Sequence, residues 1–233
     1  MREIVLDTET TGFDPASGDR IVEIGAVELM NHMPTGQTYH QYINPERSMP
    51  KSAFEVHGLG DDFLRDKPVF SKIARDFLGF IADAPLVIHN ASFDMKFLNA
   101  ELKAAGLPIL PMARSIDTVD MARKKFPGSP ASLDALCRRF GVDNSAREKH
   151  GALLDSEILA EVYLELIGGR QPDLILASRQ KTPHGSQISH EDWRPFPRLN
   201  PLPSRLTDTE TMAHRDFVVN LGETAIWAKY AKK

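Results

Sequence analysis

Cysteine is nearly absent from this sequence, since Cys137 is the only one among 233 residues. A single cysteine forms no intrachain disulfide, and the sequence offers no cysteine and histidine set suited to zinc. Because Cys137 lies in an apolar helical stretch, we expect it to pack in a core. A chain with this cysteine content is typical of a reducing cytoplasm, which is the location we predict.

Long hydrophobic runs are also missing. No apolar stretch approaches the roughly 20 residues that a membrane helix needs. The first residues, Met1 to Val5, lead directly into a strand-like run and lack the layout of a signal peptide. We therefore expect no membrane contact. Hydrophobic residues still make up 42% of the chain, which is enough for a packed core.

The sequence also lacks an excess of positive charge. The net charge is −4, whereas a protein that holds duplex DNA over many phosphates needs many cations. Two explanations fit this charge. The protein has no role with nucleic acid, or it is an enzyme that contacts only a strand end through metal ions and is brought to DNA by a partner. Charge alone does not decide between them.

The order of expected elements predicts an α/β domain. The first 45 residues contain three strand-like stretches, with turn signals at Gly18-Asp19 and Pro34-Thr35-Gly36, which indicates an antiparallel meander. Helical periodicity and short apolar strands then alternate, so we expect a mixed sheet flanked by helices. The predicted strands are 4–6, 21–29, 37–43, 86–88 and 115–119, and the predicted helices are 69–82, 93–105, 133–140 and 152–167.

The composition changes after Arg170. Six of the sixteen prolines fall between Pro172 and Pro203, a density typical of a linker, although Trp193 and Phe196 could dock on another surface. Order is expected to return at residues 207–210, which form a capping-box pattern ahead of apolar residues at helical spacing. We therefore divide the chain into a domain at 1–170, a proline-rich linker at 171–206 and a tail at 207–233.

Two acidic residues lie at the end of the first predicted strand. Asp7 and Glu9 are two positions apart, so their side chains point to the same face. A pair of solvated acids is the ordinary explanation of such spacing. Their position directly after an apolar strand argues against it, because gathered carboxylates repel one another unless cations neutralise them.

Two further clusters carry acids beside histidine. Asp94 follows the strand at 86–88 and lies in the first turn of a helix, where the ordinary role of an acid is to complement the helix dipole. His150 and Asp155 are five residues apart, so on one regular helix they would diverge by about 140°. Gly151 allows the chain to leave helical geometry, which lets the two side chains converge. Carboxylate ligands of this kind suit Mg²⁺ or Mn²⁺.

These residues carry a resemblance to a known family. Asp7-x-Glu9, His89-Asn90-x-x-x-Asp94 and His150-x-x-x-x-Asp155 resemble, in order and spacing, the three motifs of the DEDDh 3′→5′ exonucleases. Their surroundings resemble more closely the proofreading epsilon subunits of bacterial DNA polymerase III. The resemblance covers residues 1–170 and resumes more weakly in the tail. It implies an RNase H-like fold, with a five-stranded mixed sheet and a flexible C-terminal tail.

The resemblance also implies a two-metal hydrolysis that releases nucleoside 5′-monophosphates from DNA 3′ ends. Asp7 would bridge two divalent cations, Mg²⁺ or Mn²⁺. Glu9 and Asp155 would complete the ion that holds the attacking water, and Asp94 would support the second ion. His150 would act as the general base, because an imidazole with a reference pKa of about 6.5 can be neutral near physiological pH.

Substrate and partner expectations follow from the same resemblance. The terminal nucleotide would be held by Thr8, Glu9, Val56 and His57, although His57 could equally be a turn residue, and Phe93 could stack on a base or only pack its helix. The implied partners are a single-stranded or frayed DNA 3′ end, the catalytic alpha subunit of the polymerase, bound through the tail, and other subunits of the polymerase core. Two alternatives stay open: a stand-alone DEDDh exonuclease that trims RNA or DNA ends, and a binding module with dispensable catalysis.

Overall fold

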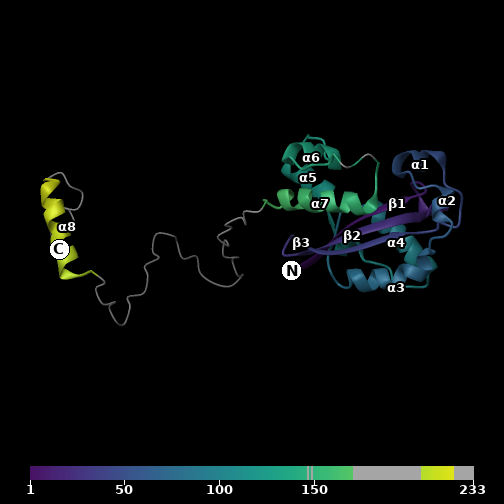
Figure 1. Cartoon of the computed structure of the whole chain (residues 1–233), viewed down its shortest axis with the longest axis horizontal. Coiled ribbons are helices and arrows are strands. Elements are labelled where there is room, and N and C mark those ends of the chain that lie inside the picture. Colours follow the sequence, from purple (N-terminus) through teal and green to yellow (C-terminus); the bar gives the residue numbers. More distant parts are fainter. Residues whose placement is uncertain (146, 148, 170–205, 223–233) are drawn as a thin grey trace, which may run out of the picture. The chain divides into compact units, whose positions relative to one another are not determined.

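The computed structural model describes residues 1–145, 147, 149–169 and 206–222. The chain divides into two units, Met1–Leu176 and Ala177–Lys233. The predicted linker at 171–206 lies almost entirely outside the described residues, as do Trp193, Phe196 and Trp227. We describe each unit by itself, beginning with the first (Figure 1).

A mixed five-stranded sheet in the order β3-β2-β1-β4-β5 forms the centre of the first unit. The first three strands, β1 (Arg2–Thr10), β2 (Ile21–Met30) and β3 (Met33–Tyr42), make the predicted antiparallel meander. The last two, β4 (Leu86–Ile88) and β5 (Ser115–Asp117), continue the sheet in parallel. The mixed sheet predicted from the sequence is therefore confirmed.

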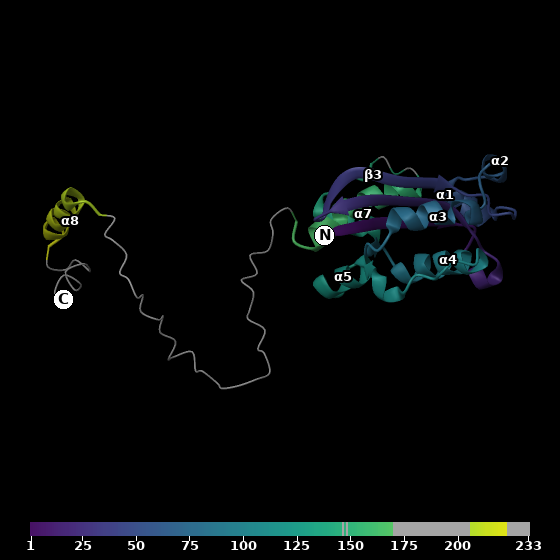
Figure 2. The ribbon, with the colours of Figure 1, turned by 90° about the horizontal axis from the view of Figure 1, so that it is seen from below.

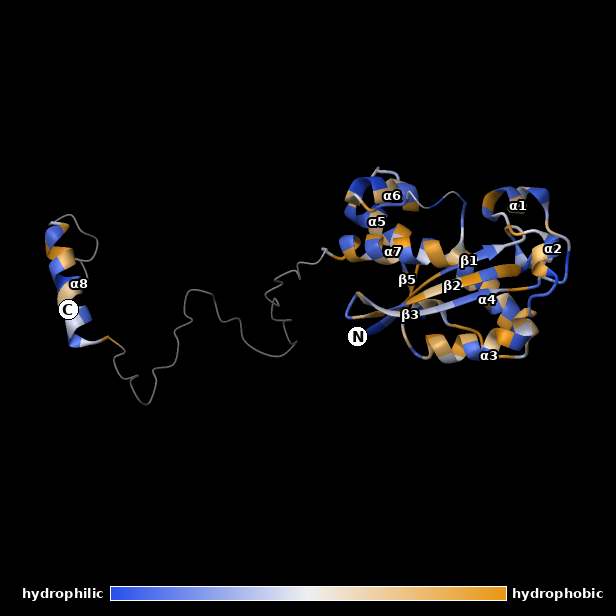
Figure 3. Ribbon diagram, in the orientation of Figure 1, coloured by the Kyte–Doolittle hydropathy of each residue, from blue (hydrophilic) through white to orange (hydrophobic). Residues whose placement is uncertain are grey.

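The prediction of a turn at Pro34-Thr35-Gly36 is wrong. The hairpin between β2 and β3 instead turns at Asn31 and His32, whose φ angles of 51° and 66° suit a two-residue turn. Residues 34–36 lie inside β3, where the pairing shifts between Val27 and Leu29. Proline and glycine are tolerated there because β3 is an exposed edge strand with an irregular register. Figure 3 shows its polar character beside the more hydrophobic β2.

Helices cover both faces of the sheet. One face packs against α3 (Phe70–Ile81) and α4 (Ala91–Ala104) in a core that includes Phe77 and Phe97. The other face packs against α7 (Ala152–Leu166), which also contacts α5 (Thr118–Lys125) and α6 (Leu133–Phe140). Figure 2 places α4 and α5 at the end of the sheet opposite β3. Cys137 is buried in the hydrophobic core on the α7 face of the sheet, as predicted.

The helices predicted from periodicity are present. The structure also contains three helices that the periodicity of the sequence did not predict. The missed ones are α1 (Lys51–His57), α2 (Asp61–Leu64) and α5. Both α1 and α2 are too short to show a helical period. In α5, Thr118 and Ala122 are the only buried residues, so it lacks an apolar stripe. Two 3-10 turns, Pro15–Ser17 and Met112–Arg114, complete the unit.

In the second unit, the described residues contain helix α8 (Asp208–Asn220). The predicted capping box is confirmed, because Thr207 accepts from the Glu210 amide and the Glu210 carboxylate accepts from the Thr207 amide. No residue of α8 is buried, and Phe217 is 59% exposed. Among the described residues, no helix is long and apolar enough to cross a membrane.

Candidate active site

The alternation of side chains along β1 directs two carboxylates toward α7. Val5 packs in the core on the α7 face, and Asp7 and Glu9 continue the same side of the strand. Asp7 pairs with Gly25 of β2. A side chain at Gly25 would meet the Ala152 backbone at 2.1 Å, so this glycine lets the start of α7 approach the sheet closely. The close approach places Asp155 beside the strand carboxylates.

Asp94 reaches the site from the first turn of α4. Asn90, the N-cap residue of this helix, has a left-handed φ of 69°, and the Asp117 carboxylate accepts a hydrogen bond from the Ala91 amide at 2.9 Å. The hydroxyl of Thr8 donates to Asp94 Oδ1 at 2.7 Å. Asp94 is therefore held in place, with 3% of its surface exposed.

His150 and Asp155 converge in the way their spacing suggested. Gly151 has an extended conformation, with φ −153° and ψ 124°, so helix α7 begins only at Ala152. His150 therefore lies on the preceding loop, with its Nδ1 3.4 Å from Asp155 Oδ2. Glu9, His150 and Asp155 each bring a ligand atom within 4.8 Å of the other two, an arrangement that could hold a metal ion.

Arg147 belongs to the site but was not predicted. Its guanidinium donates to both oxygens of Asp155, at 2.5 and 2.7 Å, and to Asp134 at 2.7 Å. It also donates to Nδ1 of His150 at 2.8 Å. An arginine three residues before the loop histidine was the available signal, yet nothing in the spacing assigns its partners. Asp155 thus has an internal cation as its partner.

The pKa values of three of the four acids are raised, which indicates that the site has too little positive charge to balance them. Burial raises the pKa of Asp7 well above its ordinary range, and the charges of Asp94, Glu9 and Asp155 raise it further. Burial and the charge of Asp155 raise the pKa of Glu9 to about 8, and burial raises that of Asp94 to about 7. Divalent cations would relieve this repulsion, so the residues present fit a metal centre.

Asp155 differs from the other three acids. Burial acts to raise its pKa, but the interactions of its carboxylate with His150 and Arg147 outweigh that effect and lower the pKa below its ordinary value. Among the described residues, Asp7, Glu9 and Asp94 form no ion pair. Asp155 is thus the one acid of the four whose charge the protein itself compensates within the described part of the chain.

Two adjoining cavities give the site its shape. The catalytic cavity, of about 290 Å³, is lined by Asp7, Asp94, Asp155, His150 and Arg147 among others. A second cavity, of about 140 Å³, is lined by the four residues expected to hold a nucleotide: Thr8, Glu9, Val56 and His57. We call it the nucleotide cavity. The two cavities share Thr8 and Phe93 as lining residues.

His57 was expected either to bind the nucleotide or to be a turn residue, and Phe93 either to stack on a base or to pack its helix. The structure is compatible with both roles of each residue. His57 is the last residue of α1, directly before Gly58 with φ 76°, and its Nδ1 accepts the Leu59 amide at 3.0 Å. It is also buried and lines the nucleotide cavity. Phe93 packs against Phe97 with ring centroids 5.0 Å apart, and it also faces both cavities.

Comparison with known proteins identifies the class. Residues 4–163, more than half of the chain, match the family model described as Exonuclease (RNase_T). The nuclease domain of 3′hExo, a DEDDh family member bound to rAMP, aligns with a TM-score of 0.62. That alignment covers 71% of this chain and 91% of the other at 21% identity, and it shows the RNase H-like exonuclease fold. The fold and the site thus define an exonuclease.

Sequence relatives narrow the family further. DNA polymerase III subunit epsilon of Rickettsia felis is 48% identical over 231 residues, covering 97% of this chain and 99% of the relative. The subunit of the same name from Escherichia coli is 42% identical over 238 residues, covering 97% of each chain. The chain therefore belongs to the family of DNA polymerase III epsilon subunits, within the 3′→5′ exonucleases. Exonucleases of the DEDDh type use divalent metal ions.

Proposed function

We propose that this chain is the proofreading exonuclease of a bacterial replicative polymerase and removes nucleoside 5′-monophosphates from DNA 3′ ends. The observation that carries the proposal is the group of four acids beside His150, in which Glu9, Asp94 and Asp155 are buried and Asp7 is half-buried. Burying uncompensated carboxylates is costly, and the raised pKa values of three of them express that cost. Bound cations would offset this cost by neutralising the carboxylates.

Each acid has a role in holding two divalent cations, Mg²⁺ or Mn²⁺. Asp7 would hold both, Glu9 and Asp155 would hold the one that carries the attacking water, and Asp94 would support the second. When bound, the ions polarise the phosphate, activate the water and stabilise the leaving oxygen. Thr8 fixes the Asp94 carboxylate through the 2.7 Å hydrogen bond, which limits the directions from which that acid can bind.

His150 takes the proton of the attacking water. The water oxygen then forms a bond to phosphorus, and the bond from phosphorus to the 3′-oxygen of the preceding nucleotide breaks. That oxygen leaves as an alkoxide and takes a proton from solvent to become the 3′-hydroxyl, while His150 returns its proton to solvent. His150 is suited to this role because it comes from a loop, is half-exposed, and lies next to Glu9 and Asp155. Arg147 donates to its Nδ1 in this structure, so the guanidinium must move before that nitrogen can accept a proton.

The terminal nucleotide would occupy the nucleotide cavity. Thr8 and Glu9 bring backbone and carboxylate groups to it, Val56 offers an apolar contact, and His57 contributes a buried ring. Burial lowers the pKa of His57, which favours its neutral form. The cavity has an apolar ring on its border with the catalytic cavity, because Phe93 lines both.

The second unit would serve as a polymerase-docking element. The relatives are named as subunits of DNA polymerase III, and residues 1–170, 171–206 and 207–233 would act as exonuclease domain, linker and tail that binds the alpha subunit. The support is α8, a capped helix without a buried residue and with Phe217 and Val219 exposed at 59% and 77%. Exposed apolar residues on a helix are typical of a surface that a partner covers.

Digestion of 5′-labelled oligonucleotides tests the activity. We expect a ladder of products shortened one nucleotide at a time, and nucleoside 5′-monophosphates in the supernatant. A single-stranded DNA, a primer with a mismatched 3′ end and an RNA of the same sequence should be compared. Rapid digestion of the RNA would favour the stand-alone trimming enzyme, and release of the label as the first product would contradict the 3′→5′ direction.

Truncation after Gly169 tests the docking element. The shortened chain should digest a short free oligonucleotide at nearly the full-length rate, while its co-purification with the alpha subunit should be lost. Tight binding of the truncated chain to the alpha subunit would show that residues 207–233 are not the docking element.

A further inference from the structure

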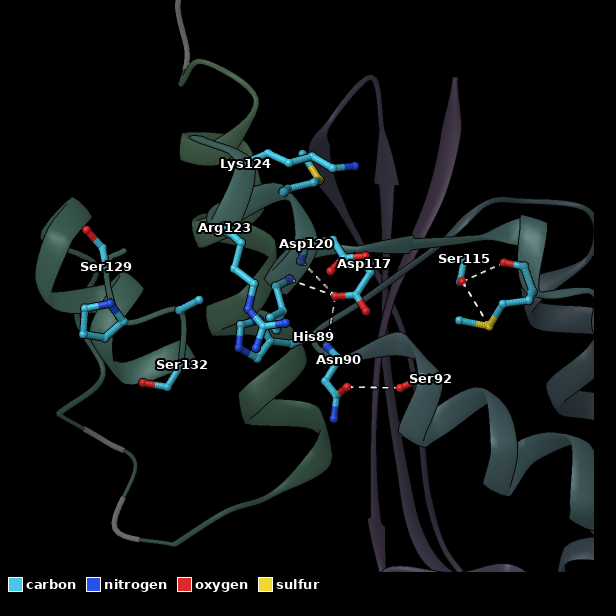
Figure 4. Close-up of a pocket in the computed structure, with 15 residues that line it drawn as sticks. His89, Asn90, Ser92, Ser115, Asp117, Asp120, Arg123, Lys124, Ser129 and Ser132 are labelled. Atoms are coloured by element: carbon cyan, nitrogen blue, oxygen red, sulfur yellow. Dashed lines mark hydrogen bonds between the residues drawn. The ribbon is translucent and has the colours of Figure 1, made fainter. Parts of the chain in front are cut away.

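We propose that a third cavity, separate from the catalytic cavity and the nucleotide cavity, holds the nucleotides that precede the 3′-terminal nucleotide. This inference rests on the proposed function. The cavity has a volume of about 1000 Å³, more than three times that of the catalytic cavity, and lies where β4 and β5 end and α5 and α6 begin (Figure 4). We call it the α5–α6 cavity.

The three cavities form a continuous row. The nucleotide cavity shares Thr8 and Phe93 with the catalytic cavity, and the catalytic cavity shares His89 and Ser132 with the α5–α6 cavity. A strand whose last nucleotide lies in the first cavity has its scissile phosphate at the second. The preceding nucleotides then leave in the direction of the third.

The chemistry of the lining suits a sugar-phosphate backbone. Four serine hydroxyls and the amide of Asn90 line the cavity (Figure 4), and such groups bind phosphate and sugar without reading the base. A proofreading enzyme must accept any sequence, so contacts of this kind are what the task requires. The four serines are Ser92, Ser115, Ser129 and Ser132.

The cations of this cavity are free to bind an anion. Arg123 and Lys124 are exposed, and neither forms an ion pair among the described residues. The acid Asp117 is already engaged, because its oxygens accept the amides of Ala91 and Val119 at 2.9 Å each. Asp120 is then the only other acid in the lining.

The surrounding sequence is basic in a chain that is acidic overall. Residues 118–140, which include α5 and α6, contain five lysines and arginines and two aspartates, whereas the whole chain has a net charge of −4. Single strands are commonly bound in positively charged grooves that follow the backbone. Of these five cations, Arg123 and Lys124 line the α5–α6 cavity and bring exposed positive charge to it.

The test compares a short and a long substrate on the full-length protein with Mg²⁺. The p-nitrophenyl ester of thymidine 5′-monophosphate can occupy only the first two cavities, whereas an eight-residue oligothymidylate must extend beyond them. The Arg123→Gln, Lys124→Gln double variant should lower the ratio of kcat/KM for the octamer to kcat/KM for the ester by about tenfold. Its octamer KM should also depend less on salt, because fewer counterions are released on binding.

A matched control removes the same charge from another surface. Lys72 and Arg75 are exposed on α3, which packs on the opposite face of the sheet and lines none of the three cavities. The Lys72→Gln, Arg75→Gln variant should keep the wild-type ratio and salt dependence. An equal loss in both double variants, or an unchanged ratio in the first, would overturn the proposal. Failure of the wild type to hydrolyse the ester would instead count against the proposed function.

Discussion

The catalytic cavity and the α5–α6 cavity share His89 and Ser132 but carry opposite chemistry. The first gathers aspartates around one arginine, two of them buried, and the second presents serine hydroxyls and two exposed cations. The first is thus prepared for cations and the second for phosphates. A protein with a net charge of −4 can therefore act on DNA when its acids and its cations line separate parts of the site.

The two cavities also differ in how firmly their groups are held. Asp94 and Asp155 are each 3% exposed and are fixed by hydrogen bonds from Thr8 and Arg147, whereas Arg123 and Lys124 lie at the surface. Changes in the catalytic cavity should therefore abolish function or alter metal binding. Changes in the α5–α6 cavity should only weaken binding of long substrates.

The largest effect that separates the cavities is expected at His150. His150→Ala should lower the single-turnover rate by about 10²–10⁴, the usual contribution of general-base catalysis, while metal binding persists. The rate at saturating metal should rise with pH through an apparent pKa in the wild type and lose that rise in the variant. An unchanged pH–rate profile in the variant would reject His150 as the base.

A smaller effect is expected at Arg147, the cation within the acidic cavity. Its guanidinium donates to both oxygens of Asp155, so a metal ion that binds this carboxylate is repelled by a neighbouring positive charge. Arg147→Gln should bind Mn²⁺ about tenfold more tightly, as measured by calorimetry in the absence of DNA. Arg123→Gln removes the same charge from the neighbouring cavity and should change that affinity much less. Weaker Mn²⁺ binding by Arg147→Gln would show that the arginine supports the metal site instead of competing with it.

The last of these effects concerns stability and pH. In the metal-free protein, Asp94 and Glu9 have pKa values of about 7 and about 8, whereas unfolded carboxyls ionise near 4. Folding therefore takes up protons between these values, and the free energy of unfolding should fall as pH rises from about 4.5 to 8. We expect this loss to appear in denaturant titrations as a lower unfolding midpoint at pH 8 than at pH 4.5.

Two additions sharpen the pH measurement. Saturating Mg²⁺ should remove the decline, because bound ions favour the ionised acids. Asp7→Asn removes one of the mutually repelling charges, so the metal-free variant should be more stable than the wild type at pH 8. A metal-free wild type that becomes more stable between pH 5 and 8 would contradict the account of repelling acids.

Local pattern was sufficient for much of the fold. The strand at 86–88 and the helix at 133–140 have the predicted bounds, because the first is a short apolar run and the second is a periodic run that ends at Gly141. The period of two in β1 also placed Asp7 and Glu9 on one face. The turn at 34–36 was wrong because proline and glycine mark an irregular pairing in an edge strand as readily as a hairpin turn.

The rest of the site depends on contacts between distant segments. Arg147 binds Asp134, thirteen residues away, and the packing that brings them together leaves no periodic trace in the sequence. Gly25 permits the approach of α7 from more than a hundred residues further along the chain. The α5–α6 cavity was missed for the same reason, since its lining comes from four separate elements and loops. The roles given to the individual site residues remain predictions.

If the four acids act only through divalent cations, digestion of DNA by this protein must stop when the cations are removed. A 5′-labelled single-stranded DNA is incubated with the wild type and with Asp7→Ala, first in Mg²⁺, then after EDTA, and again after excess Mg²⁺. We predict that the wild type cleaves in Mg²⁺, stops in EDTA and recovers on readdition, while a folded Asp7→Ala protein stays inactive throughout. Full activity of the wild type in EDTA, or of Asp7→Ala in Mg²⁺, would contradict the claim.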